Sequence, residues 1–162
     1  MQNAVLQNLF YCHTVVPKEG LAQSFVNERP NASITFVGHS KGGAEAAANG
    51  VATNRDFIIF NPATPNFGAY GLSEADFTAS GQSFIIDGEV LDLVLRRTLM
   101  RGRPVDELIS LNRPNRPAWQ ALTLLIPNVF LGIEKWRTVY THGMDAVIEA
   151  LRLAGFDNEE IC

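Results

Sequence analysis

Residues 33–43 read SITFVGHSKGG, and this stretch decides how the rest of the chain is interpreted. An apolar run ends abruptly at a serine flanked by glycines, and the helix-forming sequence AEAAA follows at 44–48. In a nucleophile elbow a strand turns sharply into a helix, and positions two before and two after the serine have no room for side chains. Gly38 and Gly42 occupy these positions. The pattern predicts that Ser40 is a nucleophile; the alternative is a tight turn with a structural serine.

Length and composition predict one globular domain over residues 1–162, with 46% hydrophobic and 19% charged residues. The net charge of −4 argues against a nucleic-acid partner. Cys12 and Cys162 are too few and too poorly spaced for a disulfide framework or a zinc site, and we expect no metal and no cofactor. The first residues lack the basic and apolar regions of a signal peptide, so the chain as given has no evident export address.

Apolar runs and their boundaries predict the secondary structure. Helical spacing indicates short helices at 4–10 and 21–26, and the elbow strand at 33–37 is the first strand that the sequence supports. Residues 57–60 and 83–87 are short apolar runs typical of strands buried in a parallel sheet. Because a helix separates the elbow strand from the next strand, these elements form a βαβ unit. We therefore expect an α/β fold with a mainly parallel sheet.

The second half of the chain is less regular. Prolines interrupt residues 91–117, which are expected to form a helix, a loop and another short helix. Arginines in this part form either a solvated loop face or a contact for anionic head groups or phosphates. Residues 119–133 are the most apolar segment, interpreted as core packing or as a lid or acyl-binding surface. Residues 136–140 are β-prone, and an amphipathic helix is expected at 144–151.

Three histidines compete for the role of general base. His39 adjoins Ser40, and in a sharp elbow the neighbouring side chain points away from the nucleophilic oxygen. His13 would reverse the order serine, acid, histidine that α/β hydrolases follow, whereas His142 keeps it. A lone histidine is more often structural, but His142 stands at a predicted strand-to-helix junction, a suitable position for a base. We therefore predict that His142 removes the proton of Ser40.

Acidic residues follow the predicted strand at 83–87, namely Asp87, Glu89 and Asp92. In open α/β sheets the chemistry collects at the carboxyl ends of strands, so an acid at this point is well placed to orient a histidine. Attack of Ser40 on an ester carbonyl would form an acyl-enzyme that water then hydrolyses. The backbone N–H of Lys41, at a helix N-terminus, is the natural oxyanion-hole donor and is worth about 3 kcal/mol in the transition state.

The elbow sequence GHSKGGA at 38–44 resembles that of the class 3 lipases and their bacterial lipase-like relatives. A wider match resembles lipase-like domains at the C-termini of large bacterial secreted or polymorphic toxins. It runs from about residue 20 to residue 151 and includes the segments 40–49, 58–64, 69–72, 88–91 and 142–148. The resemblance implies a three-layer α/β-hydrolase-like fold, short or truncated at its N-terminus. It also allows a chain secreted as part of a larger toxin-like protein.

The resemblance also selects the acid. The usual Gly-Asp-Ile/Val block of these relatives falls on residues 88–90, which makes Glu89 the orienting acid, with Asp87 in reserve. The second oxyanion donor of the relatives comes from a strand and loop before the region matched by residues 7–9, and this chain begins too late to contain that loop. Three explanations remain open: the sequence is a fragment, another segment such as His13-Thr14 supplies the donor, or the domain is catalytically impaired.

The sequence thus predicts a serine esterase or lipase acting on carboxylic esters, most plausibly lipids or phospholipids, with transient contact to a membrane surface. A hydrolase-like binding or interaction module with an incomplete oxyanion hole is the alternative, in which Ser40, Glu89 and His142 would lie too far apart for a triad. A third reading transfers the acyl group to an acceptor other than water. Strand edges left exposed at the short N-terminus would permit a homo-oligomer.

Overall fold

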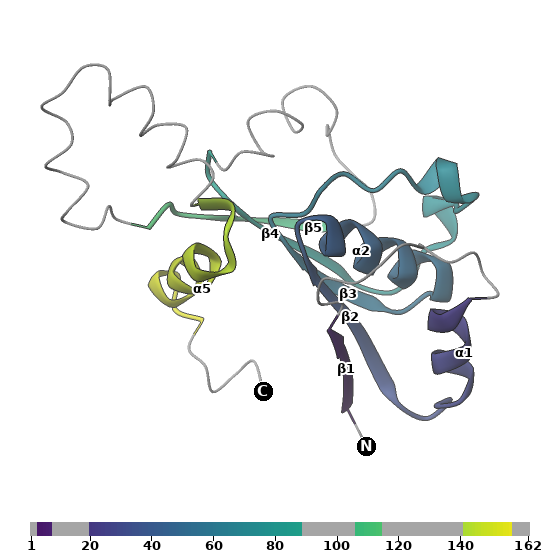
Figure 1. Cartoon of the computed structure of the whole chain (residues 1–162). Helices are drawn as coiled ribbons and strands as arrows, with labels where there is room; N and C mark the ends of the chain where they lie inside the picture. The colour runs from purple at the N-terminus through teal and green to yellow at the C-terminus, as the bar shows by residue number, and fades with distance from the viewer. Residues whose placement is uncertain (1–2, 8–19, 89–105, 115–140, 157–162) are drawn as a thin grey trace, which may run out of the picture.

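The computed structural model describes residues 3–7, 20–88, 106–114 and 141–156. Within them, five parallel strands form a sheet in the order β1-β2-β3-β4-β5 (Figure 1). The strands are β1 (Asn3–Gln7), β2 (Ser33–His39), β3 (Asp56–Phe60), β4 (Gly81–Ile86) and β5 (Glu107–Leu111). The protein therefore has a mixed α/β fold with a parallel sheet, as the sequence predicted.

Helices occur at the positions expected around the elbow and after His142. They are α1 (Leu21–Asn27), α2 (Lys41–Thr53) and α5 (Met144–Leu153), and two short 3₁₀ turns, Phe67–Tyr70 and Glu74–Asp76, precede β4. α2 connects β2 to β3, so the predicted βαβ unit is confirmed.

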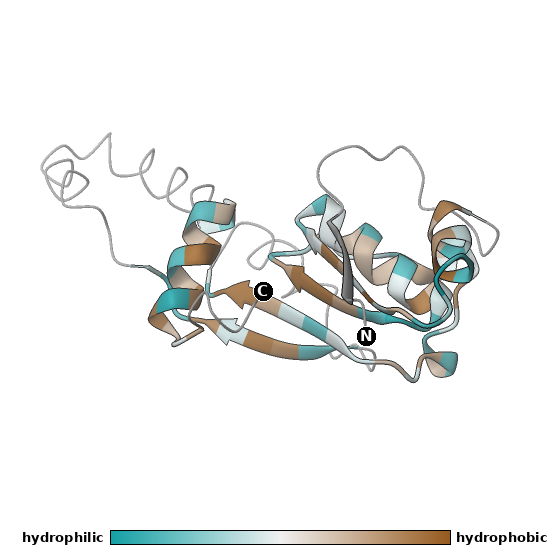
Figure 2. Ribbon diagram, turned by 90° about the horizontal axis from the view of Figure 1, so that it is seen from below, coloured by the Kyte–Doolittle hydropathy of each residue, from teal (hydrophilic) through white to brown (hydrophobic). Residues whose placement is uncertain are grey.

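The helices pack on opposite faces of the sheet. Along β3 the side chains alternate: Phe57 and Ile59 join the cluster beneath α1 and α2, whereas Ile58 and Phe60 pack against the cluster beneath α5. Figure 2 shows apolar residues concentrated along the strands, while polar and apolar residues alternate around α5, as expected of an amphipathic helix lying on a sheet. The described residues therefore form three layers.

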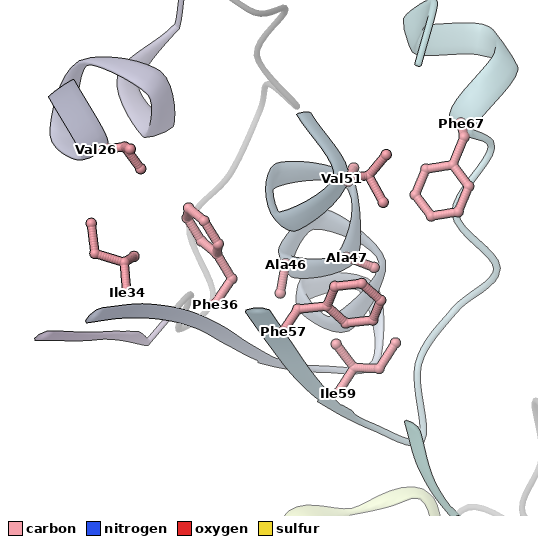
Figure 3. Packing of buried hydrophobic residues seen from close by; sticks show 10 residues of the cluster. Val26, Ile34, Phe36, Ala46, Ala47, Val51, Phe57, Ile59 and Phe67 are labelled. Carbon is pink, nitrogen blue, oxygen red and sulfur yellow. The ribbon is translucent and has the colours of Figure 1, made fainter. Parts of the chain in front are cut away.

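Small side chains let α2 approach the sheet closely. Ala46, Ala47 and Ala48 have no exposed surface and pack above Phe36 and Phe57, which stand on neighbouring strands (Figure 3). The larger apolar residues of the sheet fill the space that a longer helical side chain would need. This packing holds the middle of α2 against β2 and β3.

The helix predicted at 4–10 is wrong for residues 3–7, which form β1. This strand pairs in parallel with β2, with Asn3 opposite Ser33 and Gln7 opposite Val37. Periodicity cannot separate a short apolar run in a buried strand from one in a helix, and here pairing with the next strand decides. The sheet consequently has a strand before the elbow strand, which the sequence did not support.

The helix, loop and helix expected at 91–117 are also wrong for residues 107–111, which form β5 beside β4. A proline is typical of a break in regular structure, but Pro114 follows the end of β5 and leaves the pairing of the strand intact. Most of β5 is exposed, and only Leu111 is buried, so the strand lacks the apolar run that identified β3 and β4.

Several predicted features lie outside the described residues, including the apolar segment 119–133, the β-prone segment 136–140 and the arginines at 96, 97, 101, 103 and 116. Among the described helices, none has the length and apolar character needed to cross a membrane.

Candidate active site

Ser40 occupies a strained position between β2 and α2. Its backbone angles are φ 56° and ψ −125°, and a positive φ is uncommon for a residue with a side chain. A Cβ atom added to Gly38 would lie 2.2 Å from the carbonyl oxygen of Gly42, so only glycine fits at position 38. These are the sterics of the elbow that the sequence predicted, with the serine at its apex.

The Ser40 hydroxyl does not form a capping hydrogen bond with α2, the helix that Ser40 precedes. Ser40 is the N-cap residue of α2, where a serine side chain ordinarily accepts a hydrogen bond from the first turn, yet it makes no such bond. Instead its Oγ lies 2.8 Å from Nε2 of His142, a residue 102 positions later in the sequence. With the imidazole protonated on Nδ1, the hydroxyl donates to Nε2, which is the arrangement of a nucleophile and its base.

Backbone contacts fix the elbow to the end of β3. The N–H of Ser40 donates to the carbonyl of Phe60 at 3.1 Å, and the Ser40 carbonyl accepts from the N–H of Ala63 at 2.9 Å. His142 lies immediately before α5, whose N-cap is Gly143. The sequence therefore placed Ser40 correctly at a strand-to-helix turn. It predicts a strand-to-helix junction at His142 as well, but Thr141 and His142 are helical and Gly143 separates them from α5. The structure nevertheless brings the two side chains together.

The side chain of His39 contacts the backbone and the ring of His142. Its Nε2 lies 2.6 Å from the backbone carbonyl of His142, and the two imidazole rings are 5.0 Å apart between centroids. Since a carbonyl only accepts, Nε2 of His39 carries the proton and donates. His39 thus contacts the backbone of His142, whereas the His142 ring contacts the Ser40 hydroxyl.

Asn61 is a site residue that the sequence reasoning missed. It has no exposed surface and a positive φ of 38° directly after β3. Its Nδ2 donates to the carbonyl of Thr141 at 2.9 Å and approaches that of His142 at 3.4 Å, while its Oδ1 accepts from the N–H of Ile86 at 3.0 Å. The signal in the sequence is the pair Asn61-Pro62 directly after an apolar run, within the segment 58–64 that carries the family resemblance, but the sequence reasoning assigned no site role to it.

The reserve acid Asp87 lies at the carboxyl end of β4 but does not bond to the histidine. Its exposed carboxylate accepts from the hydroxyl of Ser110 at 2.6 Å. Arg113 holds the same turn through the carbonyls of Asp87 at 3.0 Å and Gly88 at 2.7 Å. Glu89, the acid favoured by the sequence, lies outside the described residues, one position past this turn.

The backbone N–H predicted as an oxyanion donor lies directly after Ser40. Lys41 is the first residue of α2, so its N–H belongs to the helix N-terminus. The Lys41 side chain extends along the helix, with Nζ 3.6 Å from Oε1 of Glu45. The segment His13-Thr14, considered for the second donor, lies outside the described residues.

In the part of the chain that the structure describes, no group of three histidine, cysteine or acidic residues is arranged to hold a metal ion. Comparison with protein-family models, with curated proteins and with solved structures gives no match. The chemistry of this site therefore has to be argued from its own geometry.

Proposed function

We propose that the protein is a serine hydrolase that cleaves carboxylic esters through an acyl-enzyme on Ser40, in an α/β-hydrolase-like fold. One observation carries the proposal. Ser40 is a strained N-cap residue whose hydroxyl makes no hydrogen bond to its own helix and lies 2.8 Å from Nε2 of His142. A structural serine at this position would be expected to cap α2. The contact also disfavours the non-catalytic alternative, in which Ser40, Glu89 and His142 lie too far apart for a triad, because two of these three side chains are within hydrogen-bond distance.

The reaction follows from these positions. His142 takes the proton as Oγ of Ser40 attacks the ester carbonyl, and the negative charge that develops on the carbonyl oxygen is stabilised by the N–H of Lys41. The protonated His142 then gives its proton to the leaving alcohol, which departs as the acyl-enzyme forms. A water molecule, deprotonated by His142, attacks the acyl-enzyme and releases the carboxylic acid and Ser40. Glu89 is the proposed acid that orients the imidazole.

The position of β1 bears on the second oxyanion donor. In α/β hydrolases the second donor comes from a loop that follows a strand of the sheet. β1 runs parallel to β2 and ends with Gln7 opposite Val37, three residues before Ser40, at the edge of the sheet where the elbow lies. A strand of the required direction therefore lies next to the elbow strand.

Covalent labelling tests the proposal directly. A fluorophosphonate probe should label the protein at Ser40, as located by mass spectrometry, and Ser40→Ala should abolish both labelling and hydrolysis of short-chain esters. Ser33→Ala, which changes an exposed serine of the same strand, is the matched control and should leave both unchanged. A folded wild-type protein that takes no label would refute the proposal, as would labelling that survives in Ser40→Ala.

The substrate class is a further part of the proposal, and the resemblance to class 3 lipases favours lipid or phospholipid esters. Rates on p-nitrophenyl esters of increasing chain length and on phospholipid vesicles would identify the preferred acyl group. Adding an acceptor alcohol separates hydrolysis from acyl transfer, because transfer yields a new ester in place of the free acid. Preference for short esters with no activity on vesicles would contradict the lipid assignment.

A further inference from the structure

Two donors from neighbouring strand ends converge on the backbone of the proposed base. His39, the last residue of β2, donates from Nε2 to the carbonyl of His142 at 2.6 Å. Asn61, the first residue after β3, donates to the carbonyl of Thr141 at 2.9 Å and lies 3.4 Å from that of His142. The segment that carries the base is therefore attached to the same two strand ends that hold the elbow.

The amide of Asn61 is suited to this position because it carries a donor and an acceptor on one planar group. Oδ1 accepts from the N–H of Ile86, and Nδ2 faces carbonyl oxygens 80 residues further along the chain. The backbone N–H of Asn61 also donates to the carbonyl of Phe84 at 2.9 Å. Because Asn61 is buried, the loss of any of these hydrogen bonds would leave an unpaired polar group, which is energetically unfavourable.

The geometry points to Asn61 and His39 as positioning residues for the base. We propose that their bonds to the Thr141–His142 backbone set the Cα–Cβ direction of His142, so that Nε2 reaches the Ser40 hydroxyl. This inference rests on the proposed serine hydrolase function. Because His39 adjoins Ser40 in sequence, one short segment holds both the nucleophile and the backbone of its base. Misplacing a catalytic group by about 1 Å can lower a rate on the order of a hundredfold.

The test at Asn61 uses glycine, which adopts a positive φ without strain and removes only the amide. Asn54 gives the matched control, because it also has a positive φ of 50° and its side chain bonds to Thr78 and Ala79, away from the site. Asn61→Gly should lower kcat about a hundredfold with little change in KM, whereas Asn54→Gly should lose stability at unchanged kcat. Equal kcat values for the two variants would overturn the role of Asn61.

The test at His39 keeps the proposal falsifiable if Asn61→Gly fails to fold. His39→Gln places an N–H near the position of Nε2, and His39→Leu removes it. His39→Leu should label with the fluorophosphonate about tenfold more slowly than wild type, and His39→Gln should recover most of the rate. Similar rates in both variants would overturn the role of the His39 donor.

A crystallographic readout separates failure of this inference from failure of the proposed function. In His39→Leu, and in Asn61→Gly where it folds, the Nε2 to Oγ distance between His142 and Ser40 should exceed hydrogen-bond reach, whether or not the wild type is active. Variants that keep the wild-type distance would overturn the positioning role. Wild-type protein without labelling or hydrolysis, combined with the expected displacement, would refute the function and leave the positioning intact.

Discussion

The carboxyl ends of β2 and β4 are built in different ways. At the end of β2, the steric contact that requires glycine lies within residues 38–43 themselves, where Gly38 leaves the space that the backbone of Gly42 occupies, and hydrogen bonds to Phe60 and Ala63 attach the turn to the end of β3. At the end of β4, the turn at Asp87 and Gly88 is held by Ser110 and Arg113, which come 23 to 26 residues later. The first turn carries the proposed nucleophile, and the second leads into the proposed acid.

This difference explains why the turn after β2 can be predicted from the sequence and the turn after β4 cannot. A local steric requirement leaves a local pattern, since glycine is required wherever a Cβ atom would collide with nearby backbone. A turn that is held by side chains from another strand leaves no pattern at its own position. Substitutions that disrupt each turn separately should therefore lower the free energy of unfolding by different amounts. Three substitutions, one at the first turn and two at the second, differ in the size of the expected loss.

The largest loss is expected for Gly38→Ala. The added Cβ would lie 2.2 Å from the carbonyl oxygen and 2.5 Å from the carbonyl carbon of Gly42, and backbone atoms cannot move as a flexible side chain can. We expect the free energy of unfolding to fall by about 3 kcal/mol or more. In Gly68→Ala the nearest atom is 3.7 Å away, so urea denaturation should find a change within about 0.5 kcal/mol. A similar small loss for Gly38→Ala would contradict the steric account of the elbow.

A smaller loss is expected for Gly88→Ala, at the end of β4. Gly88 has φ 71°, and a Cβ would lie 1.9 Å from Nη2 of Arg113, a side chain that can move aside. The expected destabilisation is about 2 kcal/mol, and it should fall in an Arg113→Ala background. Gly71→Ala, with φ 64° and open space around it, should cost only about 1 kcal/mol for the backbone alone.

The Gly88 variant also tests the proposed acid. If the turn positions Glu89, Gly88→Ala should lower kcat for ester hydrolysis while Gly71→Ala leaves it unchanged. If Gly88→Ala hydrolyses esters with the wild-type kcat, this turn does not position the proposed acid. That result would argue against Glu89.

The smallest effect is expected for Ser110→Ala, which removes the hydroxyl bonded to Asp87. Both residues are exposed, so water can replace the lost hydrogen bond, and the free energy of unfolding should fall by less than about 1 kcal/mol. The effect should add to that of Gly38→Ala, because the two turns share no contact. A coupling energy beyond about 0.5 kcal/mol in the double variant would show that the two strand ends are not independent.

The sequence predicted the parts of the fold whose signals are local. The elbow, the βαβ unit around α2 and the amphipathic helix α5 all follow from runs and breakers within their own residues. The strands β1 and β5 were missed, because each is defined by pairing with a neighbour rather than by its own pattern. Edge strands of this kind are the elements for which propensity is weakest and context strongest.

For the candidate site, the sequence by itself determined which serine could occupy a strained strand-to-helix turn, because the glycines around Ser40 mark positions where a side chain would not fit. It also identified His142 from chain order. Only the tertiary structure decided that the two side chains lie 2.8 Å apart, and that Asn61 and His39 hold the segment of the base. The physical reason is that hydrogen bonds between residues about 80 to 100 positions apart depend on the register and twist of the whole sheet, which no short stretch of sequence contains.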